Sequence, residues 1–383
     1  MVGNGRTVHA LVRGAAIAAR GHAVRLVTLG PVLPVEGVEV KTRPLPSSLP
    51  DALRAARGFF RDLRAFRPDL LHVHYAGGKL GTLASLARVR PLVVTVMGGD
   101  VQPEQHLDGH APLEARATRR LLHEADLILA KSDALRREIA AHGDFEAKVR
   151  TVRWGVDPEV VRRRPDQALR LRAELGLLPS DRVLLSPRIL RPLYNIHLLI
   201  EALPAILRRV PEALLLLTEH RADDDYRRRL ETRVAELGLG RRVRFVGALG
   251  HADMPAFYTL AEVMVSVPFS DGLPQSLFEA MACETPAVVG RLPAYDEVAR
   301  DGEHVLAAEL EPGAIAAAIV RLLEDPALAR RLTRASLARV REVASLPREA
   351  ARVEAMYAEL LARPRRRAPL LPRLLDAASL FLR

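Results

Sequence analysis

The sequence predicts an α/β protein of two domains, each built on a parallel sheet with helices on both faces. Its 383 residues exceed the usual size of one hydrophobic core. Short apolar runs alternate with helical patterns along the chain, which favours parallel sheets because parallel strands need crossover connections. The stretch 263–290 adds a strand, a glycine-containing loop, a helix and a second strand in immediate succession.

The composition is that of a globular chain, 49% hydrophobic and only 4% aromatic. Lys+Arg 57 against Asp+Glu 46 gives a net charge of +11, which favours anionic partners such as phosphates or a membrane surface. A genome whose base composition favours arginine codons would produce the same excess of positive charge. Nucleic acid is not expected as a partner, because no recognition motif is visible and few aromatic side chains are available for stacking.

The chain has one cysteine, Cys283, so no intrachain disulfide forms and a reducing compartment is indicated. Neither a signal peptide nor an apolar run of membrane-spanning length is visible. These features predict a cytoplasmic location.

The first domain is predicted to span residues 1–165. Its pattern predicts helices at 8–20, 53–66, 113–124 and 133–141, and strands at 23–28, 68–75, 91–96, 125–130 and 149–153. No strand precedes the glycine-rich loop Gly3–Thr7, so we expect this sheet to lack its first strand, either because the chain starts late or because that strand is dispensable.

His72 and His74 lie two apart and therefore face the same side of their strand. A metal site is disfavoured because no third ligand stands at ligand spacing. We expect one or both rings to point into the cleft at the end of the strand.

The second domain is predicted at 166–345, after an arginine-rich linker at 161–172. Its strands are expected at 182–186, 214–218, 243–247, 263–267 and 286–289, and its helices at 196–209, 226–237, from 253, 275–282, 314–323 and 327–343. A tail at 346–383 follows, with a helix from 349 to 361, a basic run at 363–367 and an amphipathic segment at 370–382. That run and segment predict either contact with anionic lipid or a packed or disordered tail.

Two carboxylates frame the loop and helix of the stretch 263–290. Asp271 lies on the loop, and Glu279 lies in the helix between apolar neighbours, where a carboxylate is costly unless it is paired. A strand that enters a helix through a glycine-containing loop also presents backbone N–H groups at the sheet edge, which makes an anion site.

This stretch resembles the acidic signature of the retaining GT-B glycosyltransferases of family 4, usually Glu-x7-Glu followed by Ala-Met-Ala-Cys. The chain keeps Gly272, Pro274, Glu279 and Ala280-Met281-Ala282-Cys283, and has Asp271 in place of the first Glu. The resemblance extends to Arg20-Gly21-His22 and to Trp154-Gly155-Val156-Asp157, which is similar to the family's Asn-Gly-Val-Asp element at the domain junction. In the family, the last helices cross back onto the first domain.

The family's diphosphate loop normally reads Gly-Arg-x4-Lys-Gly. Arg188 matches its arginine, while Tyr194 and Asn195 occupy the places of its lysine and glycine. No lysine follows Lys148, so either Arg191 supplies the second positive charge or Tyr194 and Asn195 donate hydrogen bonds instead.

By resemblance, the protein transfers a sugar with retention from a nucleoside-diphosphate sugar to a glycan or lipid-linked acceptor, in the synthesis of surface polysaccharide or glycolipid. The resemblance implies catalytic roles for Arg188, Asp271 and Glu279, with Arg188 and Glu279 converging on one nucleoside diphosphate. Donor-binding roles fall on Arg191, Tyr194, Asn195, Gly247, Gly272, Leu273, Pro274, Gln275 and Ser276. Acceptor-side roles fall on Gly5, Arg6, His74, Gly98, Gly99 and Asp100.

No metal and no cofactor besides the donor is expected, because arginine would neutralise the diphosphate. Met97 stands where the family often has a histidine that contacts the donor sugar, and it cannot make that hydrogen bond. Two alternatives stay open: a nucleotide-sugar epimerase of the same architecture, and an inactive donor-binding scaffold.

Overall fold

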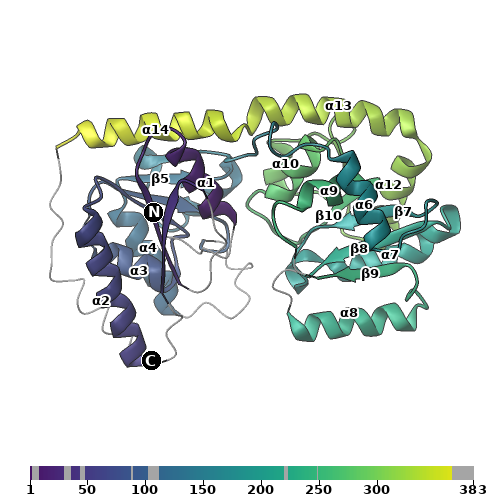
Figure 1. The fold of residues 1–383 in the computed structure, drawn as a ribbon, viewed down its shortest axis with the longest axis horizontal. Helices are drawn as coiled ribbons and strands as arrows, with labels where there is room; N and C mark the ends of the chain where they lie inside the picture. Colours follow the sequence, from purple (N-terminus) through teal and green to yellow (C-terminus); the bar gives the residue numbers. More distant parts are fainter. Residues whose placement is uncertain are drawn as a thin grey trace. The chain divides into compact units, whose positions relative to one another are not determined.

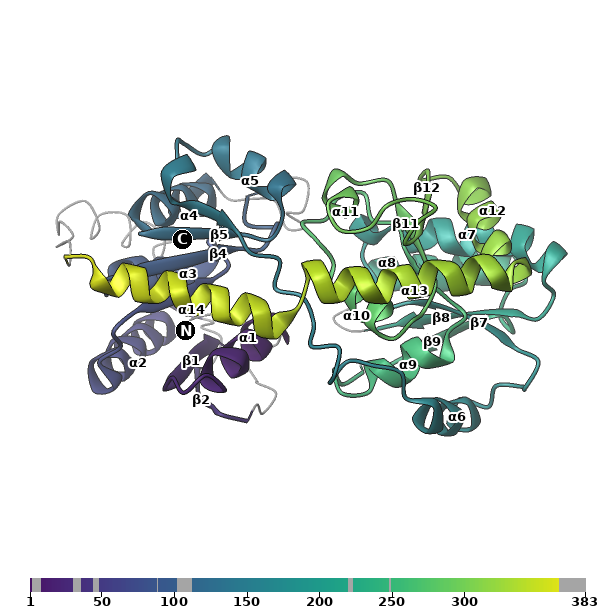
Figure 2. The ribbon, with the colours of Figure 1, turned by 90° about the horizontal axis from the view of Figure 1, so that it is seen from above.

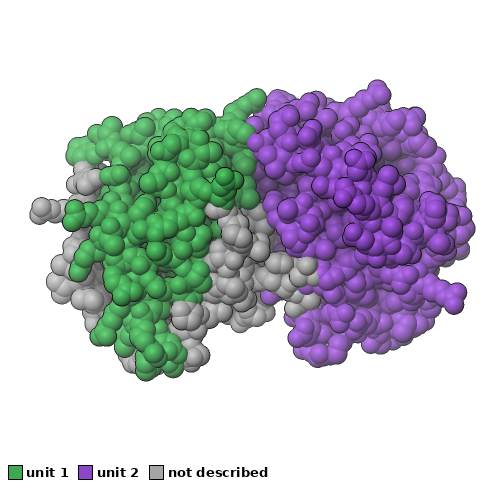
Figure 3. All heavy atoms as spheres, viewed as in Figure 1, with its two compact units in different colours: residues 1–154, 346–383 green, residues 155–345 purple. Residues whose placement is uncertain are grey.

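The computed structural model describes residues 1, 8–29, 36–43, 48–87, 89–101, 112–219, 223–247 and 249–364. The chain divides into two compact units, one formed by 1–154 with 346–383 and the other by 155–345 (Figure 3). Both units are parallel α/β structures, so the predicted fold class is confirmed (Figure 1). The first unit ends at Trp154, earlier than the predicted boundary at 165.

The first unit contains two groups of parallel strands among its described residues. β1 (Val24–Leu29) pairs with β2 (Val38–Arg43), and a separate sheet has the order β3-β4-β5-β6. The latter strands are Leu71–His74, Leu92–Val96, Leu127–Ala130 and Val149–Thr151. Every residue of β3, β4 and β5 is buried, which agrees with their continuous apolar pattern and with helices on both faces.

Met1 lies beside β1. Its amino group donates to the carbonyl oxygen of Arg25 at 2.6 Å, and its own carbonyl oxygen accepts from the N–H of Val27 at 3.0 Å. A small cavity next to it is lined by Met1, Arg25, Val27, Asp62, Leu63, Phe66, Pro68 and Leu71. The cavity touches β1 and the first residue of β3, two strands that belong to different sheets among the described residues.

The helices of the first unit are α1 (Val8–Ala18), α2 (Leu49–Phe66), α3 (Gly78–Leu86), α4 (Pro112–Glu124), α5 (Asp133–Ala140) and α14 (Leu346–Ala362). Although α14 is far away in sequence, it packs beside α1 (Figures 1 and 2). Its Val353 and Leu360 share an apolar core with Ile17 of α1 and with Trp154. The final described helix is therefore part of the first unit.

The described strands of the second unit form one sheet with the order β12-β11-β10-β7-β8-β9. They are β7 (Arg182–Ser186), β8 (Ala213–Thr218), β9 (Val243–Val246), β10 (Val263–Ser266), β11 (Ala287–Gly290) and β12 (Leu306–Ala308). The strand order changes direction between β7 and β10, which places a crevice at their carboxyl ends. The predicted diphosphate loop follows β7, and the acidic stretch follows β10.

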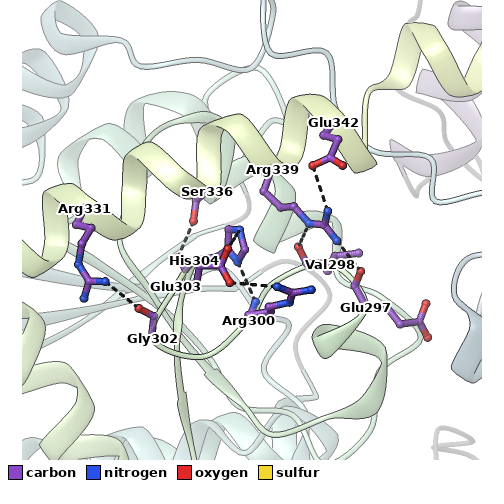
Figure 4. A network of polar contacts seen from close by, with 10 residues as sticks. All are labelled: Glu297, Val298, Arg300, Gly302, Glu303, His304, Arg331, Ser336, Arg339 and Glu342. Carbon is purple, nitrogen blue, oxygen red and sulfur yellow. Dashed lines mark hydrogen bonds and ion pairs between the residues drawn. The ribbon is translucent and has the colours of Figure 1, made fainter.

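The helices of this unit are α6 (Pro165–Glu174), α7 (Ile196–Arg209), α8 (Asp224–Glu236), α9 (Met254–Leu260), α10 (Gln275–Ala282), α11 (Pro293–Asp296), α12 (Pro312–Glu324) and α13 (Pro326–Val343). Figure 4 shows side chains of α13 hydrogen-bonded to the backbone of the segment that follows α11. Arg339 donates to the carbonyl oxygens of Glu297 and Val298, and the hydroxyl of Ser336 donates to the carbonyl oxygen of His304 at 2.6 Å.

Some elements differ from the sequence prediction. The segment predicted as a linker contains α6, which Pro165 begins and which packs against α9. The strand β12 and the helix α3 were not predicted, because each is short and lacks a strong periodic pattern. The strand β2 was also not predicted, although Val38 and Val40 alternate with Glu39 and Lys41. The helix α2 begins at Leu49 rather than at Leu53, since the Ser48 hydroxyl accepts from the N–H of Asp51 and caps it.

Candidate active site

Arg188 lies in the loop after β7, and its guanidinium is held by residues from two other segments. Nη2 donates to Asp271 Oδ2 at 2.7 Å, and Nη1 donates to the hydroxyl of Ser276 at 3.3 Å. The guanidinium also stacks 4.3 Å from the centre of the Tyr194 ring. The predicted arginine, the first carboxylate and the start of α10 therefore meet at one point.

The charges at this point are strongly coupled because little water reaches them. The side chains of Arg188 and Asp271 are only 11% and 12% exposed. Burial alone would lower the pKa of Arg188, but the negative charge of Asp271 and the nearby Tyr194 and Tyr295 outweigh it and raise the pKa above the usual arginine value. Arg188 is therefore permanently cationic.

Asp271 also accepts hydrogen bonds from Tyr295 OH at 3.1 Å and from the N–H of Leu273 at 3.2 Å. Its carboxylate is thus the centre of the cluster. The pKa of Tyr295 lies well above its ordinary value, because the ring is buried and faces that carboxylate, so Tyr295 is a neutral donor at physiological pH.

The loop 187–195 is fixed to the loop that carries Asp271. Asn195 adopts a left-handed conformation with φ of 51°, a region that asparagine tolerates better than most residues. Its Nδ2 donates to the carbonyl oxygen of Val267 at 3.0 Å, and the N–H of Phe269 donates to the carbonyl oxygen of Leu193 at 2.9 Å. Asn195 therefore links its loop to the end of β10, while Tyr194 contacts the Arg188 guanidinium directly.

The turn Gly272-Leu273-Pro274 is buried and leads into α10, where Pro274 occupies the N-cap position and makes no side-chain cap. The first N–H groups of a helix have no intrahelical acceptors, and a proline cap leaves them available to an anion. Gln275 does not point to this spot, since its Nε2 donates to the carbonyl oxygen of Gly155 at 2.8 Å.

Glu279 lies one turn along α10 from Ser276, on the same face of the helix. It is 6% exposed, accepts from Tyr258 OH at 2.9 Å, and lies 3.7 Å from His251. Burial raises the pKa of Glu279, while His251 and the bond from Tyr258 partly offset that rise. The pairing required of a carboxylate in an apolar setting is thus supplied by a tyrosine and a histidine.

The two other predicted donor-binding positions are Arg191, within the loop 187–195, and Gly247. Nε of Arg191 is buried without a hydrogen-bond partner among the described residues. Gly247 follows β9 and is exposed.

In the first unit, His74 ends β3 and stacks on His72 with ring centres 4.1 Å apart. The ring of His72 does not face a cleft, in contrast to one form of the prediction, because its nitrogens contact Thr95 Oγ1 and Tyr357 OH. The described ranges contain no group of three or more His, Cys, Asp or Glu residues arranged to hold a metal ion.

Asp100 was predicted on the acceptor side, yet its carboxylate is turned into the protein. It accepts from the N–H groups of Ala76, Met97 and Gly98 at 2.7–2.9 Å and is 1% exposed. It therefore braces the carboxyl ends of β3 and β4 and shapes the turn that contains Gly98 and Gly99. Gly5 and Arg6 lie outside the described residues.

Several contact residues were missed by the sequence reasoning. Tyr258, Tyr295 and His251 have no local pattern that distinguishes them, because their partners lie 21 to 28 residues away in sequence. Arg13 is a different case: an arginine within the apolar face of α1 is a visible anomaly, and it proves to be buried.

Two family models match the chain. The model described as glycosyl transferases group 1 matches residues 168–339, and the model described as glycosyltransferase family 4 matches residues 3–160. Together they cover both units, with the Arg188 cluster in the first match and His74 and Asp100 in the second. The chain belongs to the GT-B glycosyltransferases of family 4, as predicted.

The chain is also similar to individual glycosyltransferases. The chain is 29% identical, over 80% of its own length and 74% of the relative, to D-inositol 3-phosphate glycosyltransferase 2 of Catenulispora acidiphila. It is 31% identical over 297 residues to the D-inositol 3-phosphate glycosyltransferase of Mycobacterium bovis, of which it spans 58%. It is 28% identical to the GDP-mannose-dependent alpha-(1-6)-phosphatidylinositol monomannoside mannosyltransferase of Mycolicibacterium smegmatis, with 64% of each chain covered.

Solved structures share the fold. A structure of Anabaena HepE in complex with UDP and glucose has a TM-score of 0.76 at 18% identity, covering 94% of this chain and 99% of that one. A sucrose-phosphate synthase from Thermosynechococcus elongatus has a TM-score of 0.77 at 23% identity, with 94% and 95% covered. Within the described ranges, no helix is both long and apolar enough to cross a membrane.

Proposed function

We propose that this glycosyltransferase moves a sugar, with retention of configuration, from a nucleoside-diphosphate sugar to a glycan or lipid-linked acceptor in surface polysaccharide or glycolipid synthesis. The observation that carries the proposal is the permanent cation of Arg188, held between Asp271 and the first turn of α10. Two structures of HepE, which shares the fold, contain UDP with glucose and UDP-glucose, and one relative is named as GDP-mannose-dependent. These similarities support a nucleotide-sugar donor for this chain.

In this proposal, the diphosphate lies between Arg188 and the N–H groups that open α10. Negative charge grows on the leaving diphosphate in the transition state, and a fixed cation with aligned N–H groups stabilises it without further reorganisation. Glu279 accepts from the ribose hydroxyls, displacing or sharing its bond from Tyr258. Asp271 orients Arg188 and offers a carboxylate oxygen to the sugar.

No metal is required in this scheme, because arginine and the helix N–H groups carry the compensating positive charge. Activity is therefore expected to survive treatment with EDTA. Loss of activity on chelation, with recovery on adding Mg²⁺ or Mn²⁺, would contradict this part of the proposal.

The decisive experiment is a thermal-shift screen of a panel of nucleotide sugars, because a donor that binds only the folded state raises the melting temperature. Arg188→Ala should abolish the shift and slow transfer together, since each charge-assisted bond contributes about 1.5–3 kcal/mol. Turnover of the donor without any acceptor would instead indicate the epimerase. Donor binding without turnover across many acceptors would indicate the scaffold.

We also propose peripheral binding to the inner face of the plasma membrane through the tail. The arginines at 363–367 precede an apolar segment at 370–382, and residues 365–383 lie outside the described residues. Deleting the residues after Ala362 should reduce sedimentation with anionic vesicles. Equal sedimentation of the full chain and the truncated chain would refute this.

A further inference from the structure

Arg13 of α1 is a buried cation with no counter-ion among the described residues. Its residue is 2% exposed, and Nη1 contacts His74 Nδ1 at 3.4 Å and Met97 Sδ at 3.2 Å. Among the described residues, Nη2 has no hydrogen-bond partner, and no carboxylate forms an ion pair with Arg13. An unpaired buried guanidinium is strongly unfavourable, so its retention calls for a compensating anion.

A second unsatisfied donor lies against the same guanidinium. The Arg13 guanidinium carbon is 5.0 Å from the centre of the Trp154 ring, and Nε1 of Trp154 is buried without a hydrogen-bond partner among the described residues. The indole N–H can only donate, and so can the guanidinium. Both groups therefore require an acceptor, and the cation favours one with negative charge.

The aromatic and imidazole neighbours do not supply that charge. Burial raises the pKa of Tyr357, which keeps its hydroxyl neutral. Burial, followed by the positive charges of the N-terminus and Arg13, lowers the pKa of His72 well below the usual value, so that ring is neutral too. Arg13 itself keeps its proton at neutral pH, because burial lowers its pKa only to about 9.

The cluster lies at the ligand-binding edge of the sheet. His74 ends β3, Met97 directly follows β4, and Trp154 follows β6, so three carboxyl ends contribute to it. Tyr75 and Trp154 adopt left-handed conformations, with φ of 87° and 46°, which bulky residues seldom do outside functional sites. Met97 is partly exposed, and its flexible side chain contacts the Arg13 guanidinium through Sδ.

We propose that Arg13 and Trp154 form a subsite for an oxyanion, a phosphate or a carboxylate group carried by the acceptor. Movement of Met97 would admit the anion, which would then accept from Nη2 of Arg13 and from the indole N–H. The assignment to the acceptor rests on the proposed function. The existence of the anion site does not, because it concerns residues of the first unit alone.

The test uses Trp154, the only tryptophan of the chain, as an internal probe. The full chain is titrated with inorganic phosphate at constant ionic strength, balanced with chloride, while tryptophan fluorescence is followed. A saturable change is expected in the wild type. In Arg13→Met it should be lost or the affinity weakened about tenfold or more, as expected for removal of a charged hydrogen bond.

Arg57→Met is the matched control, because Arg57 is an exposed arginine of the same unit and its loss removes the same charge. It should titrate like the wild type. Arg13→Lys keeps the positive charge and should retain partial phosphate binding. It keeps the test interpretable if Arg13→Met fails to fold. No saturable change in the wild type, or the same change in Arg13→Met, would overturn the proposal.

A parallel titration with acetate identifies the group: a response to phosphate alone assigns a phosphate ester, and a response to both admits a carboxylate. Acceptors compared with and without the anionic group should differ in KM for the wild type and not for Arg13→Met. The nucleotide thermal shift should remain in Arg13→Met, so failure of the anion site and failure of donor binding are measured separately.

Discussion

The Arg188–Asp271 pair allows the sharpest prediction. Asp271→Asn keeps the shape of the side chain but removes the negative charge that holds Arg188. The amide oxygen can still accept from Leu273 or Tyr295, so the main loss is the ion pair across 2.7 Å. With its carboxylate gone, Arg188 keeps only Ser276 and the face of Tyr194.

The magnitude follows from the burial of the pair. Two unit charges about 4 Å apart attract by roughly 4 kcal/mol at an effective dielectric constant of about 20. Breaking a buried pair by removing one partner typically costs about 3–5 kcal/mol. Because the side chains are 11% and 12% exposed and one of these two hydrogen bonds to the amide oxygen can persist, we expect the free energy of unfolding to fall by about 2–4 kcal/mol.

The assay is thermal and denaturant unfolding with and without a nucleoside diphosphate. Without ligand, the melting temperature of Asp271→Asn should fall by roughly 5–15 °C. With ligand, its melting temperature should rise by more than that of the wild type, because the diphosphate no longer competes with Asp271 for Arg188. Arg188→Ala should show no such rise.

Glu262→Gln is the matched control. Glu262 accepts from Arg182 at 2.6 Å in the same unit, but this pair is more exposed and lies outside the site. Its loss should cost about 0–1 kcal/mol and leave the ligand response unchanged. The reasoning about Asp271 is refuted if Asp271→Asn is as stable as the wild type, or if the nucleotide shifts both proteins equally.

Three further predictions concern buried groups. Because burial raises the pKa of Glu279 above its unfolded value, its ionisation penalises the fold: stability should fall as pH rises from the unfolded pKa of about 4.3 through the raised one. Glu279→Gln should flatten this dependence of the free energy of unfolding on pH, measured by denaturant titrations at several pH values, and should weaken donor binding. An unchanged pH dependence would contradict the role given to Glu279. A β-carbon on Gly155 would lie 1.6 Å from the carbonyl oxygen of Ala344, so Gly155→Ala should destabilise by at least about 1–3 kcal/mol in urea unfolding; a neutral effect would show that the backbone there yields easily. Burial raises the pKa of Cys283 to about 12, so a thiol reagent at pH 8 should label it only after unfolding, and rapid labelling of the native protein would contradict this.

Much of the candidate site was predictable because its signals are local. The strand-loop-helix pattern around Asp271 and Glu279, and the loop that carries Arg188, depend on residues close together in sequence. The continuous apolar runs of β3, β4 and β5 likewise indicated buried parallel strands, since strands covered on both faces need apolar residues at every position. The helix α3 was missed for the same reason: local periodicity was its only sequence signal, and that signal is weak in this short segment.

The partners of the charged groups were decided by the tertiary structure. Arg188 and Asp271 are 83 residues apart, and their direct pairing follows from the adjacency of β7 and β10 in the sheet. Asp100 looked like a ligand-facing carboxylate, but the close approach of β3 and β4 turns it to three backbone N–H groups. The sequence by itself determined which residue types stand at the carboxyl ends of the strands. Packing between distant segments determined which buried polar groups are satisfied by the protein and which, like Nη2 of Arg13 in α1, find no acceptor among the described residues, because burial and hydrogen bonding depend on neighbours that only the folded chain brings together.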